Sequence, residues 1–236
     1  MSKELLVLSV MAASIGFFHT LIGPDHYLPF IVMSKARNWS IFRTGLITFF
    51  CGVGHILSSV ILGFMGIIFG IAVMKIEALE NFCGNLAAWA LIGFGFAYFV
   101  WGIRRAIRHK PHSHIHIHDI EEHNAHEHIH IGSHAHVHDN KPINITPWIL
   151  FTIFVLGPCE PLIPILMYPA AKNSLTGLFL VTGIFGSITI MTMLILVILM
   201  SLGIRILPLG KMERYSHALA GAAIFLSGLA IQFLGL

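Results

Sequence analysis

Long apolar runs separated by short polar connections dominate this 236-residue chain. Six runs reach about the length needed to cross a bilayer, for which roughly 20 apolar residues in a helix suffice. Their approximate limits are residues 5–33, 44–73, 82–103, 147–169, 175–203 and 215–235. The pattern predicts an all-α, polytopic membrane protein with six transmembrane helices.

The composition agrees with this interpretation, because 56% of the residues are hydrophobic and only 11% are charged. Soluble domains carry about 25% charged residues. The sequence shows no Walker motif, no nucleic-acid-binding pattern and no Ser-His-Asp hydrolase arrangement. The three cysteines Cys51, Cys83 and Cys159 are too few for a disulfide framework. We therefore expect neither an enzyme nor a nucleic-acid-binding protein, and no prosthetic group.

The basic residues give the six runs an orientation. Of the 14 lysines and arginines, 11 lie in the connections that follow the first, third and fifth runs. Cytoplasmic connections are enriched in such residues, which places both termini outside the cytoplasm in a cell (inner) membrane. The 11 residues are Lys35, Arg37, Arg43, Arg104, Arg105, Arg108, Lys110, Lys141, Arg205, Lys211 and Arg214.

A polar insert divides the chain into residues 1–103, residues 104–146 and residues 147–236. Twelve of the 16 histidines lie between His109 and His138 in this insert. Such a segment cannot bury an apolar core, so we expect a disordered cytoplasmic loop in the absence of metal. Imidazole binds zinc, copper, iron and nickel, and a mobile cluster selects poorly among them. A solvated loop that responds to pH is the alternative.

The first apolar run is interrupted by polar residues that are costly inside a membrane. His19, Asp25 and His26 surround a helix-breaking Gly23-Pro24 pair. Ionisable residues at membrane depth mark substrate or ion paths, and a broken helix frees backbone groups beside them. The stretch therefore predicts a metal-ion site.

The fourth run contains a similar break. Gly157-Pro158 aligns with Gly23-Pro24, so that Cys159 corresponds to Asp25 and Glu160 to His26. Two halves of three helices, each opening with a broken helix, must insert with opposite orientations because three is odd. The sequence thus predicts an inverted repeat with a binding site near the bilayer midplane.

The candidate metal ligands are few, and Asp25 and Glu160 are the only carboxylates well inside the predicted runs. Asp25 could bind the ion or orient a ligand histidine. His55 could instead be a packing histidine, and Cys159 could serve only to pack the break. The full candidate set is His19, Asp25, His26, His55, Cys159 and Glu160.

These residues carry a resemblance to a known family. His19 followed by Asp25-His26 resembles the first-helix motif of the nickel/cobalt transporter superfamily, although five residues separate them here and four is usual. Gly-Pro-Asp-His and Gly54-His55 are closest to its urease-accessory-like membrane branch. Gly157-Pro158-Cys159 and the His-rich insert resemble its nickel/cobalt efflux proteins.

The stretch around Cys159 also resembles the Pro-Cys motif of transmembrane thiol-disulfide electron carriers. Those proteins need a cysteine in each repeat, because electrons pass through a pair of thiols. Here the position that corresponds to Cys159 is Asp25. This difference argues against redox chemistry.

The resemblance and the residues together predict a secondary transporter of divalent transition-metal ions. Nickel or cobalt is the expected substrate, with zinc and iron as alternatives, and efflux is the expected direction. Proton coupling through a carboxylate is compatible with the ligand set, and a homo-oligomer stays open. The alternatives are an importer and a membrane accessory protein that delivers nickel through the insert.

Overall fold

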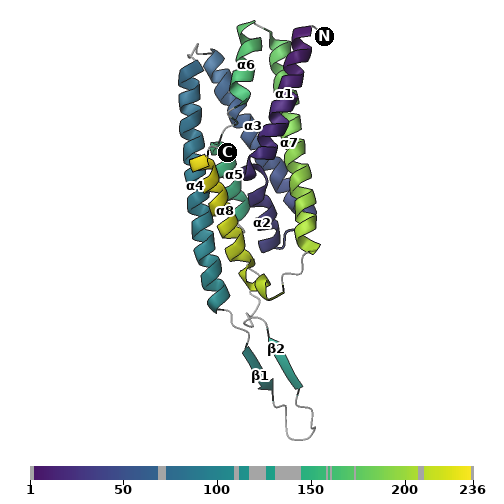
Figure 1. Ribbon diagram of the computed structural model, residues 1–236, viewed down its shortest axis with the longest axis vertical. Helices are drawn as coiled ribbons and strands as arrows, with labels where there is room; N and C mark the ends of the chain where they lie inside the picture. The colour runs from purple at the N-terminus through teal and green to yellow at the C-terminus, as the bar shows by residue number, and fades with distance from the viewer. Residues whose placement is uncertain are drawn as a thin grey trace.

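The fold was analysed in a computed structural model. The structure describes residues 3–68, 73–108, 112–116, 126–130, 145–157, 159, 161–172, 174–206 and 210–234. The helices are α1 (Lys3–Ile22), η1 (Pro24–His26), α2 (Leu28–Ala36), α3 (Ile41–Ile68), α4 (Val73–Arg108), α5 (Thr146–Leu156), α6 (Leu162–Ala171), α7 (Leu175–Ile206), η2 (Gly210–Tyr215) and α8 (Ser216–Leu234). Figure 1 shows them as one elongated bundle.

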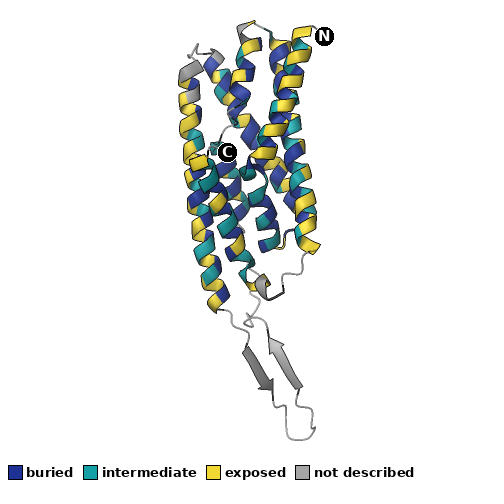
Figure 2. Ribbon diagram, viewed as in Figure 1, coloured by how far each residue is buried: buried dark blue, intermediate teal, exposed yellow. Residues whose placement is uncertain are grey.

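Five helices of the described chain are long and apolar enough to cross a membrane, namely α1, α3, α4, α7 and α8. Their outward faces are exposed (Figure 2), and apolar rings such as those of Phe42, Trp89 and Phe179 lie on them. This confirms the prediction of a helical, membrane-embedded protein. The first and fourth predicted runs are each broken, the first into α1, η1 and α2 and the fourth into α5 and α6.

The two broken segments run in opposite directions. In Figure 1 the chain descends through α1 and α2, and it ascends through α5 and α6. Proline accounts for part of each break, because it donates no backbone hydrogen bond and clashes with the preceding turn. Pro24 opens η1 at the first break, and Pro161 directly precedes α6 at the second.

The third helix is longer than the apolar run that predicts it. It was expected over residues 82–103, whereas α4 spans Val73–Arg108. Lys75, Glu77 and Glu80 interrupt the apolar pattern but not the helix, since lysine and glutamate are good helix formers. Glu80 is buried, so it adds a carboxylate within a membrane helix that the sequence prediction left out.

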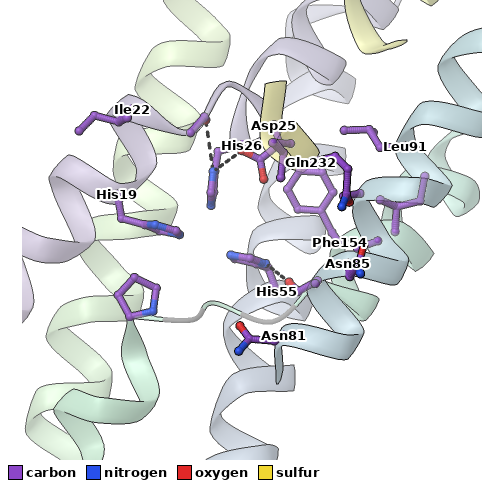
Figure 3. A pocket seen from close by; sticks show the side chains of 18 residues that line it. His19, Ile22, Asp25, His26, His55, Asn81, Asn85, Leu91, Phe154 and Gln232 are labelled. Atoms are coloured by element: carbon purple, nitrogen blue, oxygen red, sulfur yellow. Dashed lines mark hydrogen bonds and ion pairs between the residues drawn. The ribbon is translucent and has the colours of Figure 1, made fainter. Parts of the chain in front are cut away.

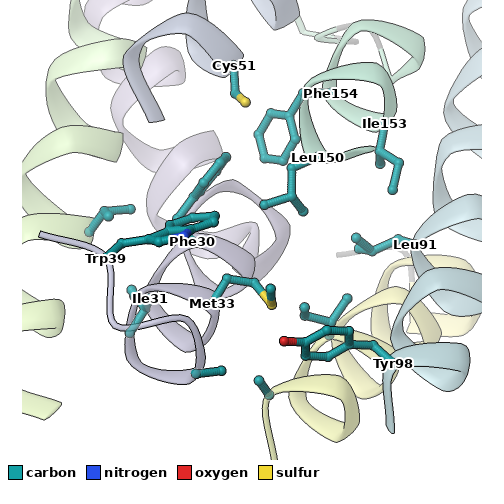
Figure 4. Close-up of a cluster of buried hydrophobic side chains, with 14 of the residues drawn as sticks. Phe30, Ile31, Met33, Trp39, Cys51, Leu91, Tyr98, Leu150, Ile153 and Phe154 are labelled. Atoms are coloured by element: carbon teal, nitrogen blue, oxygen red, sulfur yellow. The ribbon is translucent and has the colours of Figure 1, made fainter. Parts of the chain in front are cut away.

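Two apolar clusters fill the bundle. One lies between α2, α3, α4, α5, α7 and α8 and includes Phe30, Trp39, Leu150 and Phe154 (Figure 4). The other joins α1, α3, α6 and α7. On α3, Cys51 belongs to the first cluster and Ile56 to the second, so His55 lies where the two clusters meet.

Helices α4 and α8 pack against each other along a seam of glycines. A Cβ atom at Gly95 would overlap the backbone of Phe225, and one at Gly221 would overlap the backbone of Phe99. Gly102 faces the backbone of Ala218 in the same way. Small residues allow membrane helices to approach closely and gain van der Waals contact. The seam therefore fixes α8 on α4.

The polar insert begins later than predicted and contains a short hairpin. Helix α4 continues to Arg108, and β1 (His112–His116) pairs antiparallel with β2 (His126–His130). The sequence predicts no regular structure for residues 104–146, because a His-rich, low-complexity segment cannot bury an apolar core. The register places histidine opposite histidine at three positions, His112–His130, His114–His128 and His116–His126. The rest of the insert lies outside the described residues.

Candidate metal centre

The break between α1 and α2 brings His19, in the last turn of α1, beside His26, at the end of η1. Helix α1 ends with a hydrogen bond from the Gly23 N–H to the His19 carbonyl, 3.0 Å long. Pro24 then starts the short η1 helix, which ends at His26. A Cβ atom at Gly23 would stand 2.6 Å from His26 Nδ1, so only glycine lets the histidine fold back over the break.

Three imidazoles converge at this level. One candidate ligand atom from each of His19, His26 and His55 lies within 4.8 Å of the other two. The ring centroids of His19 and His26 are 4.7 Å apart, and those of His26 and His55 are 5.1 Å apart (Figure 3). The Nε2 atoms of all three are buried and have no hydrogen-bond partner among the described residues. Buried polar atoms normally have partners, so these three nitrogens point to a bound ligand.

Hydrogen bonds to the other ring nitrogen determine the tautomers of His26 and His55. His26 Nδ1 lies 3.1 Å from Asp25 Oδ1 and 3.2 Å from the Gly23 carbonyl oxygen, both of which only accept. His55 Nδ1 lies 2.6 Å from the Gly157 carbonyl oxygen. Each Nδ1 must therefore carry the proton, which leaves the Nε2 lone pair free. This is how histidines that bind metal are usually oriented.

Asp25 thus lies outside the group of converging ligand atoms and accepts a hydrogen bond from His26. Of the two roles that the sequence leaves open for it, the geometry favours the orienting one. The Gly157 carbonyl oxygen, at the second break, likewise accepts a hydrogen bond from His55 Nδ1 and so orients that ring. The two broken segments therefore meet at the histidine cluster.

Cys159 lies elsewhere. It is fully buried in the apolar cluster of Ala12, Ile56 and Leu162, and its backbone N–H donates to the Ser59 hydroxyl. It does not line the cavity beside the histidines. Glu160, the other candidate from the second break, lies outside the described residues. The structure therefore joins three of the six candidates directly and Asp25 through His26.

A cavity of about 520 Å³ adjoins the three imidazoles. Its far wall carries three carboxamides, from Asn81 and Asn85 on α4 and Gln232 on α8 (Figure 3). None of these three amides is among the candidates that the sequence predicts. A usable signal was present, since Asn81 and Asn85 are one helical turn apart at the start of an apolar run.

Comparison of the chain with family models, with curated proteins and with solved structures finds no match. The chemistry of the site therefore stands on its geometry. Neutral imidazole nitrogens suit zinc, copper, iron, cobalt and nickel, whereas magnesium and calcium require oxygen ligands. Three such nitrogens beside a carboxylate fit a divalent transition-metal ion.

Proposed function

We propose that this protein is a secondary membrane carrier of divalent transition-metal ions, with nickel or cobalt as the substrate. The convergence of three unpartnered Nε2 atoms inside a bundle of apolar helices is the observation that carries the proposal. Polar ligands at a helix break, next to a cavity, are how many carriers build an ion site. A purely structural ion would have no need of the cavity.

We also propose that the chain crosses the membrane six times as two inverted repeats. One offset along the chain relates Gly23 to Gly157, Gly52 to Gly186 and Ile56 to Ile190. The packing is reciprocal: a Cβ at Gly52 would lie 3.3 Å from Ile190, and one at Gly186 would lie 3.2 Å from Ile56. These matched contacts between α3 and α7 support a pseudo-two-fold axis between the halves.

The distribution of basic residues favours a cytoplasmic location for the His-rich insert and an inner-membrane protein with both termini outside. An insert that collects ions where they are in excess serves export. We therefore propose efflux from the cytoplasm as the direction of transport.

Radiolabelled nickel flux in membrane vesicles tests the function. We expect ATP-independent accumulation in inverted vesicles, and we expect His26→Ala to abolish it. His217→Ala is the matched control, because His217 hydrogen-bonds to Tyr98 at 2.8 Å and does not line the cavity. Accumulation only in right-side-out vesicles would reverse the direction. No flux of nickel, cobalt, zinc or iron in either orientation would overturn the carrier proposal.

A further inference from the structure

We propose that the bound ion keeps several water ligands, and that the carboxamides of Asn81, Asn85 and Gln232 hold those waters. The inference rests on the proposed ion site and concerns the chemical species that the site accepts. It assigns a hydrated, six-coordinate ion to this cavity. It also assigns a role in ion selection to three residues of α4 and α8.

The histidines occupy only one side of the cavity. They come from α1, η1 and α3, whereas the amides come from α4 and α8 on the opposite side (Figure 3). An ion on the three Nε2 atoms would therefore have its remaining coordination positions directed into the cavity. A water molecule takes up about 30 Å³ in the liquid, so about 520 Å³ is far more than an ion without water can fill.

The chemistry of the amides suits water bound to a cation. A carboxamide oxygen accepts hydrogen bonds, and water polarised by a divalent ion is a strong donor. Among the described residues, none of the three amide side chains hydrogen-bonds to another protein group. Amides on apolar helices are costly without partners. A hydrated ion would satisfy all three without adding charge.

The same wall reaches the outer surface of the bundle. Asn81 and Asn85 are exposed at the edge of the bundle, in the half of α4 remote from the hairpin, and Gln232 lies near the last residue of α8, Leu234. An ion that leaves the imidazoles toward this edge would pass the amides as it regains water.

A site with three imidazoles and three waters favours particular metals. Zinc sites in proteins are almost always four-coordinate or, in catalytic sites, hold a single open position. Nickel and cobalt readily accept six ligands. The amide wall would thus favour nickel and cobalt over zinc, which histidines alone would not do.

Cobalt absorption spectroscopy on the purified full-length protein tests the inference. Four-coordinate Co²⁺ absorbs visible light intensely, whereas six-coordinate Co²⁺ absorbs weakly. The histidines of the insert also bind Co²⁺, so the spectrum of His26→Ala is subtracted from that of the wild type. We expect a weak, six-coordinate difference spectrum for the wild type.

We expect Asn85→Leu and Gln232→Leu to give a more intense spectrum of lower coordination and to weaken Co²⁺ binding by about tenfold, as changes to outer partners of a metal typically do. Asn85→Ser, which replaces the carboxamide by a hydroxyl that still accepts hydrogen bonds, should retain most of the wild-type affinity. Leu86→Ala is the matched control on α4, since Leu86 does not line the cavity. An unchanged spectrum and affinity in both leucine variants, or an intense four-coordinate wild-type spectrum, would overturn the inference and leave the carrier standing. A wild type that binds Co²⁺ no better than His26→Ala would overturn both.

Discussion

The two halves of the chain, residues 3–108 and 145–234, correspond in their packing and differ in their chemistry. Each contains a helix broken after a glycine, at Gly23 and Gly157. Each third helix contains the spacing Gly-x₃-Phe-x₂-Gly, in α4 from Gly95 to Gly102 and in α8 from Gly221 to Gly228. The glycines of each motif face the backbone of the other helix.

The histidines of the site have no counterpart in the second half. At the offset that relates Gly23 to Gly157, His19 corresponds to Ile153 and His55 corresponds to Thr189. Thr189 is fully buried, and its hydroxyl lies 3.1 Å from where a Cβ at Gly16 would stand. The shared positions thus explain how the halves pack. The positions that differ carry the histidines of the proposed ion site.

The substitution His55→Thr would give the first half the residue of the second half, and we expect the largest effect here. It removes one of three ligands, so nickel affinity should fall by more than about 100-fold, which is the upper end for changes to the outer partners of a metal. Calorimetric titration and vesicle flux both measure the loss. Retention of wild-type affinity would show that His55 only packs against Phe154, whose ring centroid is 6.0 Å away.

Substitution of a seam glycine should lower stability by a similar amount whether the glycine lies on α4 or on α8. Gly95→Ala and Gly221→Ala should each lower stability by about 1–3 kcal/mol, because the added methyl overlaps backbone atoms of the partner helix. Thermal unfolding in detergent measures the change. Gly93→Ala is the matched control, since a Cβ there meets nothing within 4 Å, and it should raise helix stability by up to about 1 kcal/mol. A loss at only one of the two seam glycines would contradict the correspondence.

The smallest expected effects on nickel affinity are those of substitutions at Asp25 and at its counterpart Cys159. Asp25→Asn weakens the hold on His26 Nδ1 and should reduce nickel affinity by about tenfold. Cys159→Ser should leave affinity and flux close to wild type, because Cys159 does not line the cavity. Loss of all activity in Cys159→Ser would instead favour the thiol-disulfide carrier.

Apolar periodicity and the Gly-Pro pairs were sufficient to predict the apolar helices and their two breaks. The polar residues within the runs singled out His19, His26 and His55, which the structure brings together, and Asp25, which contacts His26. These patterns could not predict where Cys159 points, because side-chain direction at a break depends on turn geometry that spacing alone does not determine. The amides escaped notice for another reason. An uncharged Asn85 within an apolar run gives little signal until α8 is known to lie beside α4.

The apolar run predicts only part of α4, because Lys75, Glu77 and Glu80 lie in the helix and outside the run. Glu80 shows that a carboxylate can continue a helix and still be buried. The Gly-x₃-Phe-x₂-Gly spacing, in contrast, was present twice in the sequence and could have paired α4 with α8 directly.

The seam between α4 and α8 also bears on the ancestry of the chain. Gly95 receives Phe225, and Gly221 receives Phe99, so the two motifs form a self-complementary surface in the antiparallel sense. Two separate copies of one three-helix polypeptide, inserted in opposite orientations, would make these two contacts without any change of residue. The seam has the form that a homodimer interface of such a polypeptide would take. Duplication and fusion of one three-helix unit would make that interface internal.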